Sequence, residues 1–256
     1  MKVFQSILLL VSCQFLPTLA LNCVMIRGNL KQIDAGSGSV VGVNNRNEAF
    51  VLTDNTFRKI GRSLKHISVG PAGMVGVNAA DKIFKLQGGS FVQIQGNLKQ
   101  VDAGGDQIIS GTNVNDDTYC LNMDDNNQWS PSAIPWVSIN GKLKYFSCGP
   151  YSCWGVNSAD KVFILKNVSS NACSGSGFED IDGSLSMIEV ATDGRVFGVN
   201  YRGILHHRTG VTRSNPTGTD WVLMAFACPN GHKHVSFDLG FLWVVCGDGS
   251  IRKCTL

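Results

Sequence analysis

The chain has 256 residues, a formal charge of +3 at pH 7, 16% charged residues and 29 glycines. Charged residues fall well below the roughly 25% of an average soluble protein, and glycine exceeds its usual share of roughly 7%. The hydrophobic content of 43% excludes a disordered chain, and the small net charge gives no reason to expect nucleic acid as a partner. This composition favours an all-β protein with many tight turns.

Residues 1–20 have the pattern of a secretory signal peptide. A basic start at Lys2 is followed by an apolar run, and small residues end at Ala20, where we expect cleavage. The run is too short to cross a bilayer, and no other stretch has about 18 uninterrupted apolar residues. We therefore expect a secreted protein without a membrane span. Cleavage removes Cys13 and leaves eight cysteines, an even number that implies four disulfides.

The rest of the chain is built from repeats. The motif GNLKQI at 28–33 returns as GNLKQV at 96–101, with degenerate copies RSLKHI, GKLKYF and GSLSMI. An asparagine that ends a motif such as VGVN follows each leucine after 14 or 15 residues. A more degenerate sixth copy runs from His232 to Cys246. Six copies with four short β-rich segments each are typical of a propeller.

We therefore predict an all-β fold, a six-bladed β-propeller that forms one domain over residues 21–256. Glycine in every repeat and the lack of a 3.6-residue period disfavour a helical solenoid. Residues 23–26 match the fourth segment of a repeat, and the last copy ends after its third segment. The N-terminal strand is thus expected to join the last blade and close the ring. The expected blades cover about 27–60, 61–94, 95–139, 140–181, 182–224, and 225–256 together with 21–26.

The repeat positions suggest one pairing among the 105 that eight cysteines allow. One pair lies on strands that become neighbours when the ring closes, and one flanks a hairpin turn of the fourth copy. A third pair lies within the sixth copy, and the two remaining cysteines form the last pair. In that order, the expected bridges are Cys23–Cys254, Cys148–Cys153, Cys228–Cys246 and Cys120–Cys173.

The repeated pattern x-L-K-x-I-x-x-G, followed by G-V-N and D-x-I-F, resembles the tectonin repeat. Segments such as KQVDAGGDQII at 99–109 and CPNGHKHVSFDLG at 228–240 are similar to those of secreted tectonin-repeat lectins, over the whole of residues 21–256. The resemblance implies a six-bladed lectin that binds N-acetylglucosamine and related bacterial or egg-envelope glycans. It also implies agglutination in egg defence and a calcium ion in the central tunnel. Copy six departs most from the pattern, and Ser186 replaces the lysine of copy five.

The residue four positions after each repeat leucine bears an oxygen atom in all six copies. The first strand of a propeller blade is usually innermost, so these side chains should lie near the tunnel, where oxygen ligands suit calcium. Cap or turn chemistry at a strand end is the alternative, and backbone carbonyls could also hold such an ion. The acidic members, which are the candidate calcium ligands, are Asp34, Asp102 and Glu189.

The asparagines that end the second segments are candidate sugar ligands, because an amide both donates and accepts hydrogen bonds. A turn residue that bonds its own backbone is the alternative. Aspartates follow three of these asparagines, and tryptophans would supply the aromatic face that a sugar site usually has. The candidate carbohydrate-binding residues are Asn44, Asn78, Asn113, Asn157, Asn200, Asp81, Asp116, Asp160, Trp129 and Trp136.

A lysine directly follows the leucine position in five copies, at Lys31, Lys65, Lys99, Lys144 and Lys233. Such a ring of lysines could attract phosphate-rich glycans. Solvated strand residues whose stems pack on neighbours are the alternative.

The sequence carries no G-x-S-x-G, H-E-x-x-H or P-loop motif, so we expect neither an enzyme nor an organic cofactor. His232 and His234 could share one face of a strand, but no third zinc ligand lies near them in the sequence. Asn167 begins a sequon and is a candidate glycosylation site. A homo-oligomer is compatible with these features. A structural or protein-binding component of the egg envelope, without a sugar site, is the alternative to a lectin.

Overall fold

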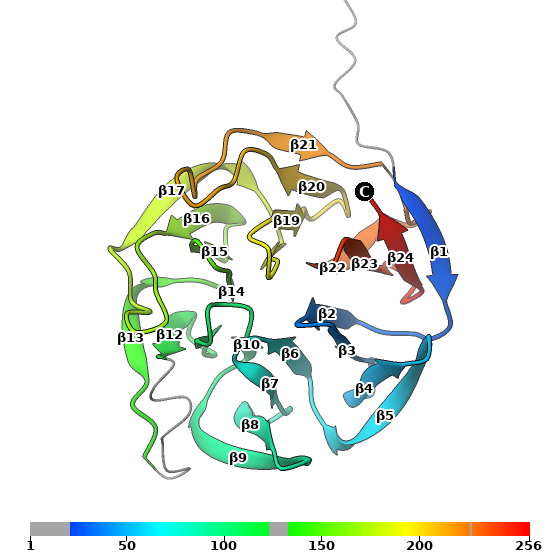
Figure 1. Ribbon diagram of the computed structural model, residues 1–256, viewed down its shortest axis with the longest axis horizontal. Helices are drawn as coiled ribbons and strands as arrows, with labels where there is room; N and C mark the ends of the chain where they lie inside the picture. The colour runs from blue at the N-terminus through cyan, green and yellow to red at the C-terminus, as the bar shows by residue number, and fades with distance from the viewer. Residues whose placement is uncertain (1–20, 123–132, 226) are drawn as a thin grey trace, which may run out of the picture.

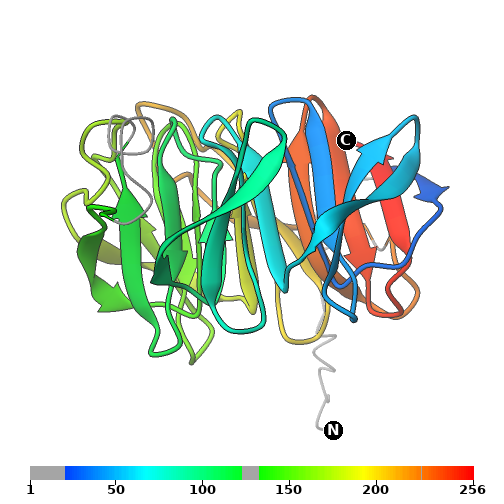
Figure 2. The same cartoon turned by 90° about the horizontal axis from the view of Figure 1, so that it is seen from below.

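The computed structural model describes residues 21–122, 133–225 and 227–256. In these ranges the chain forms six four-stranded antiparallel sheets and no helix. The sheets stand around a common axis like the blades of a propeller (Figure 1), and the side view shows a flat disc (Figure 2). The predicted six-bladed β-propeller is therefore confirmed.

Five blades use four consecutive strands, which run from the axis to the rim. Strands of the first three blades are β2 (Gln32–Gly36), β3 (Ser39–Val43), β4 (Glu48–Thr53), β5 (Thr56–Ser63), β6 (His66–Gly70), β7 (Gly73–Val77), β8 (Lys82–Gln87), β9 (Ser90–Asn97), β10 (Gln100–Asp102), β11 (Ile109–Thr112), β12 (Asp117–Leu121) and β13 (Val137–Lys142). Strands of the last three are β14 (Tyr145–Cys148), β15 (Cys153–Val156), β16 (Lys161–Leu165), β17 (Phe178–Ser184), β18 (Met187–Val190), β19 (Val196–Val199), β20 (Leu205–Arg208), β21 (Trp221–Leu223), β22 (His232–Asp238), β23 (Phe241–Cys246), β24 (Ile251–Thr255) and β1 (Asn22–Ile26).

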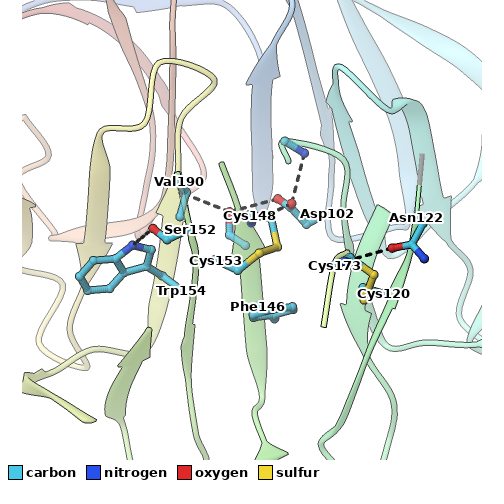
Figure 3. Close-up of a disulfide and its surroundings, with 12 residues drawn as sticks. Asp102, Cys120, Asn122, Phe146, Cys148, Ser152, Cys153, Trp154, Cys173 and Val190 are labelled. Atoms are coloured by element: carbon cyan, nitrogen blue, oxygen red, sulfur yellow. Dashed lines mark hydrogen bonds between the residues drawn. A yellow bond between two sulfur atoms is a disulfide. The ribbon is translucent and has the colours of Figure 1, made fainter. Parts of the chain in front are cut away.

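The N-terminal strand closes the ring as predicted. Strand β1 pairs with β24 and becomes the outermost strand of the last blade, with Cys23 opposite Cys254. These two cysteines form a disulfide across 231 residues of sequence. The other three bridges also follow the repeat positions, and two of them are drawn in Figure 3. They are Cys120–Cys173, Cys148–Cys153 and Cys228–Cys246.

The repeat leucine and the glycine of the second strand are in contact within each of the first five blades. A Cβ atom on Gly42 would lie 2.6 Å from Cδ1 of Leu30, and Gly76 has the same relation to Leu64. The leucines are almost fully buried, at 1% and 0% exposed. The second strand therefore needs a glycine at this point, because any larger residue would displace the leucine from the core.

In the first four blades the outer strands run three residues beyond the blade ends expected from the sequence, whereas β21 ends at Leu223, next to the expected end at 224. In the second blade, Lys82 pairs with Asn97 while Ile83 pairs with Ile94, so two residues of β9 bulge out of the ladder. One of them, Gly96, has φ +121°, a conformation that favours glycine. The repeat glycine thus belongs to a β-bulge at the rim, and the next blade begins after it.

Candidate functional site

The asparagine that ends each second strand closes a turn. Oδ1 of Asn44 accepts hydrogen bonds from the backbone N–H groups of Arg46 (2.9 Å) and Glu48 (3.0 Å). The same two bonds, to the residues two and four ahead, are made by Asn78, Asn113, Asn157 and Asn200. The side-chain oxygen of each asparagine is therefore used by its own turn, which is the alternative that the sequence left open.

The repeat lysine pairs with the third residue after that asparagine. Asp81 adopts a left-handed backbone with φ +63°, and its carboxylate forms an ion pair with Lys65. Equivalent contacts join Lys31 to Asn47, Lys99 to Asp116 and Lys144 to Asp160. Three of the lysines are thus neutralised within their own blade, which disfavours a role for them as a ring that attracts anions.

A groove of about 410 Å³ lies between the second and third blades. We call it the Trp136 cleft. Its walls come from the β7–β8 turn, the bulge of β9, the β11–β12 turn and the start of β13. The lining residues are Asp81, Ile83, Gly96, Asn97, Leu98, Asn113, Val114, Tyr119 and Trp136.

Trp136 is held at the edge of this cleft by one hydrogen bond. Its Nε1 donates to the backbone carbonyl of Gln95 over 2.8 Å, directly before the bulged Gly96. The ring remains half-exposed, beside the half-exposed Tyr119 and the exposed amide of Asn97. The cleft therefore combines an aromatic surface with hydroxyl, amide and carboxylate groups, which suits a small ligand with one apolar face and many hydroxyls.

A second groove, of about 340 Å³, occupies the equivalent place between the fourth and fifth blades. We call it the Trp221 cleft. Nε1 of Trp221 donates to the carbonyl of Asp182 over 2.8 Å, directly before the bulged Gly183. Trp221 rests edge-on against the buried Trp154, with ring centroids 6.1 Å apart. The lining residues are Asp180, Ile181, Asp182, Arg208, Thr219, Asp220 and Trp221.

The other blade junctions carry no tryptophan at this repeat position. Phe57 and Phe178 replace it at two of them, where the grooves shrink to about 200 and 50 Å³. At the first-to-second junction, Arg62 stands where the others have the bulge glycine, and its guanidinium lies over the ring of Phe84. A large groove and an anchored indole therefore occur together at only two of the junctions among the described residues.

Of the residues singled out in the sequence, the Trp136 cleft brings together Asp81, Asn113 and Trp136. The other candidate asparagines and aspartates serve separate turns in their own blades. Sequence reasoning missed Tyr119 and Asn97, and it did not assign Trp221 to a site. The repeat contained an indication for the second cleft, because Trp136 and Trp221 share one repeat position.

The acidic residues assigned to the tunnel do lie at the axis, on the innermost strands (Figure 1). The Ser236 hydroxyl is 3.0 Å from Oδ1 of Asp34 and 3.0 Å from Oε1 of Glu189. Asp102 accepts bonds from the N–H groups of Cys148 and Gly104 and from the Ser147 hydroxyl (Figure 3). Burial raises the pKa of all three carboxyl groups, and their mutual repulsion adds to it in Asp102 and Glu189, giving Asp102 a pKa of about 7.

The axis offers hard oxygen donors to a cation, although no three His, Cys, Asp or Glu side chains of the described residues group around one metal position. Backbone carbonyls approach one another at the end of the innermost strands. A Cβ atom on Gly104 would lie 2.7 Å from the carbonyl oxygen of Cys148 and 3.4 Å from that of Val190. Carbonyls and carboxylates of this kind are the donors that calcium takes.

The remaining sequence predictions concern the signal peptide, Trp129, the sequon at Asn167 and membrane spans. Residues 1–20 and Trp129 lie outside the described residues. Asn167 is exposed in the β16–β17 loop, which Cys173 ties to Cys120. No helix with the length and apolar character needed to cross a membrane occurs in the part of the chain that the structure describes.

Comparison with known proteins supports the repeat analysis. The Tectonin domain model matches residues 29–247. The chain is 77% identical to a fish-egg lectin of Cyprinus carpio over 237 residues, which are 92% of this chain and 99% of the carp protein. It is also 29% identical over 96 residues to a tectonin β-propeller repeat-containing protein of Drosophila melanogaster, covering 34% of this chain and 7% of that protein.

Solved structures share the fold at low sequence identity. A gluconolactonase from Xanthomonas campestris superposes with a TM-score of 0.64 and 10% identity, over 92% of this chain and 89% of that one. A virginiamycin B lyase from Staphylococcus aureus gives a TM-score of 0.56 and 12% identity, over 86% and 77%. At such identities the likeness concerns the propeller fold alone.

Proposed function

The chain belongs to the tectonin family, and we propose that it is a secreted, multivalent lectin that binds glycans containing N-acetylglucosamine. The observation that carries the proposal is the pair of equivalent inter-blade clefts, each with an indole anchored beside a bulge glycine. The high identity to a fish-egg lectin supports the same function. The four disulfides support an extracellular location, where such bridges persist.

The Trp136 cleft has the chemistry that an N-acetylated sugar requires. The apolar face of a pyranose ring can lie on the indole, while the exposed side chain of Val114 offers a contact for an acetamido methyl group. The Tyr119 hydroxyl and the Asn97 amide can exchange hydrogen bonds with ring hydroxyls and with the acetamido group. Burial of one small sugar in an open groove is worth little alone, so weak binding at each cleft is expected.

Two weak clefts on one rigid disc favour targets whose sugars also repeat. When both clefts engage a single surface, the second contact forms at a high effective concentration, which raises the overall affinity. Bacterial cell walls and egg envelopes are surfaces of this kind. We therefore propose agglutination of bacteria in egg defence as the physiological role, and no enzymatic activity.

Calcium at the axis is part of this proposal. Asp34 and Glu189, which share Ser236, would hold the ion together with backbone carbonyls near Cys148 and Val190. The ion would neutralise carboxyl groups that are costly to ionise when buried. A fall in thermal midpoint after chelation, restored by calcium, supports this proposal, and an unchanged midpoint contradicts it.

Glycan-array binding with free N-acetylglucosamine as competitor tests the lectin function. Binding to chitin-type glycans that free sugar abolishes supports it, with galactose as the matched control sugar. The absence of competition at tens of millimolar sugar contradicts it and favours the alternative, a structural component of the egg envelope. Titration of the purified chain adds the stoichiometry, for which the two clefts predict two sugars.

A further inference from the structure

Three ring side chains from alternate blades meet at the axis. His66 comes from β6, Tyr145 from β14 and His234 from β22. Nε2 of His66 lies 3.2 Å from the Tyr145 hydroxyl, and Nε2 of His234 lies 2.9 Å from it. The ring centroids are 5.7 to 6.2 Å apart, and the three planes meet at 60° to 64°. The nitrogen and oxygen atoms of the three rings thus converge on one point.

These residues share one repeat position. Each lies two residues after the repeat leucine or, in the sixth copy, two residues after His232, which replaces that leucine. In the first and third blades that position holds a glutamine, which ties its blade to the next one. Nε2 of Gln32 donates to the carbonyl of Ile67, and Nε2 of Gln100 donates to that of Phe146. The converging Nε2 and hydroxyl atoms of the three rings make no such link, although a backbone hydrogen bond joins His234 to Ile33 of the first blade. The converging atoms therefore face one another and not a neighbouring strand.

The cluster is poorly satisfied as a hydrogen-bond network. The Tyr145 hydroxyl has one proton, so it can donate to only one of the two imidazoles, and the other must donate to it. Nδ1 of His66 is buried without a hydrogen-bond partner. Buried polar atoms in that state cost stability and call for an explanation.

We propose that His66, Tyr145 and His234 form a site for one divalent transition-metal ion, zinc or copper(II). Bonds of about 2.0–2.1 Å from a tetrahedral ion place its ligand atoms roughly 3.3 Å apart. The two separations of 3.2 and 2.9 Å are close to that value. A water molecule would take the fourth position. When copper binds, the phenol proton leaves to solvent and the phenolate oxygen becomes the ligand.

The surroundings leave the imidazoles available to a metal. Burial lowers the pKa of both histidines, that of His234 to about 3, so no proton competes for the ligand nitrogens at neutral pH. Lys31 and Lys65 face His66 and oppose a cation there. Tyr145 is faced by the carboxyl groups of Asp34, Asp102 and Glu189, which lie two residues further along the innermost strands, roughly 7 Å away. These carboxyl groups favour a cation at the site.

The ligand set separates this site from the proposed calcium position. Calcium takes oxygen donors, whereas two imidazole nitrogens with a phenol oxygen select zinc or copper. Excess calcium is therefore not expected to displace the ion. The site also stands apart from the rim clefts, so its test is independent of sugar binding.

Metal titration of the full-length secreted protein tests the proposal. After removal of bound metal, the chain is titrated with zinc chloride and, separately, with copper(II) sulfate in calcium-containing buffer. One ion per chain is expected. His66→Gln and His234→Gln should each weaken binding roughly tenfold or more, and Tyr145→Phe should abolish the phenolate-to-copper absorption band. His206→Gln, on β20 outside the cluster, is the control and should bind as the unchanged protein does.

The absence of stoichiometric binding of either ion would overturn the proposal, as would an affinity that both histidine variants leave unchanged. Crystals of the unchanged protein grown with zinc give a second measurement that does not depend on variants. Anomalous density at the zinc edge between the three rings supports the site. Density elsewhere, or none, overturns it.

Discussion

The indole of Trp136 lies against Gly96 so closely that a Cβ atom at position 96 would stand 2.9 Å from Nε1 of the indole. Trp221 has the same relation to Gly183, at 3.0 Å. In each case the indole N–H reaches the carbonyl of the residue before the glycine. The bulge glycine is thus a requirement of the cleft, because a side chain there would push the ring away from its anchor.

Gly96→Ala should destabilise the protein and weaken binding at the Trp136 cleft. The substitution places a side chain in a left-handed conformation and against the indole, which together cost about 1–3 kcal/mol. Denaturant unfolding and sugar titration measure the two effects. Gly61→Ala is the control, because a Cβ atom there meets nothing within 4 Å. Equal effects of the two substitutions would refute the steric argument.

Trp136→Ala should reduce the number of sugars bound per chain from two to one, and Trp221→Ala should do the same at the other cleft. Each substitution removes the aromatic surface of one site while the other stays intact, since additivity holds for distant positions. Calorimetric titration with N-acetylglucosamine counts the sites. Phe178→Ala removes the ring at an equivalent position whose groove is only about 50 Å³, and it should leave the count at two.

Removal of the ring-closing disulfide should cost more stability than removal of the hairpin disulfide. In the chain-entropy model, Cys23–Cys254 closes a loop of 231 residues and contributes about 5 kcal/mol, whereas Cys148–Cys153 closes one of five and contributes about 2 kcal/mol. Paired Cys→Ser variants in denaturant unfolding measure the difference. A larger loss from the hairpin pair would show that the native contacts of the buried Cys148–Cys153 bridge, and not loop entropy, dominate.

Asp102 should make the calcium-free protein less stable as the pH rises from about 4 to about 7. The folded protein holds the Asp102 proton up to a pKa of about 7, whereas the unfolded chain releases it near the usual value of about 3.9. The stabilisation is therefore complete below pH 4 and is lost as the pH passes 7.

The measurement is the thermal midpoint in chelator, compared with that of Asp102→Asn across the same range. The unchanged protein should lose stability relative to this variant as the pH rises. A constant difference between the two proteins would contradict the raised pKa. The comparison cancels the opposite effect of His66 and His234, whose lowered pKa values make both proteins less stable below about pH 6.5.

The repeat contained enough information to predict the six blades, the closing strand and the four disulfides. The first five copies carry a leucine, a glycine and an asparagine at nearly constant spacing, so each strand can be assigned its place in a blade from the sequence alone. Cys23 and Cys254 could be paired because closure of the ring leaves them on adjacent strands. Four of the blade ends were placed three residues early, because a bulge such as that at Gly96 adds residues to the rim strand without changing the repeat.

Periodicity by itself could not locate the clefts or the axial cluster. Asn113 and Trp136 share a groove, whereas Asn157 closes its turn and lines none of the four grooves described above. The two asparagines nevertheless occupy the same repeat position. His66 and His234 are 168 positions apart, and the ring of blades alone brings them to the same phenol oxygen. Within a blade, local patterning sets strand order and packing. Contacts between blades depend on which individual side chains face each other across the ring, and only the tertiary structure decides that.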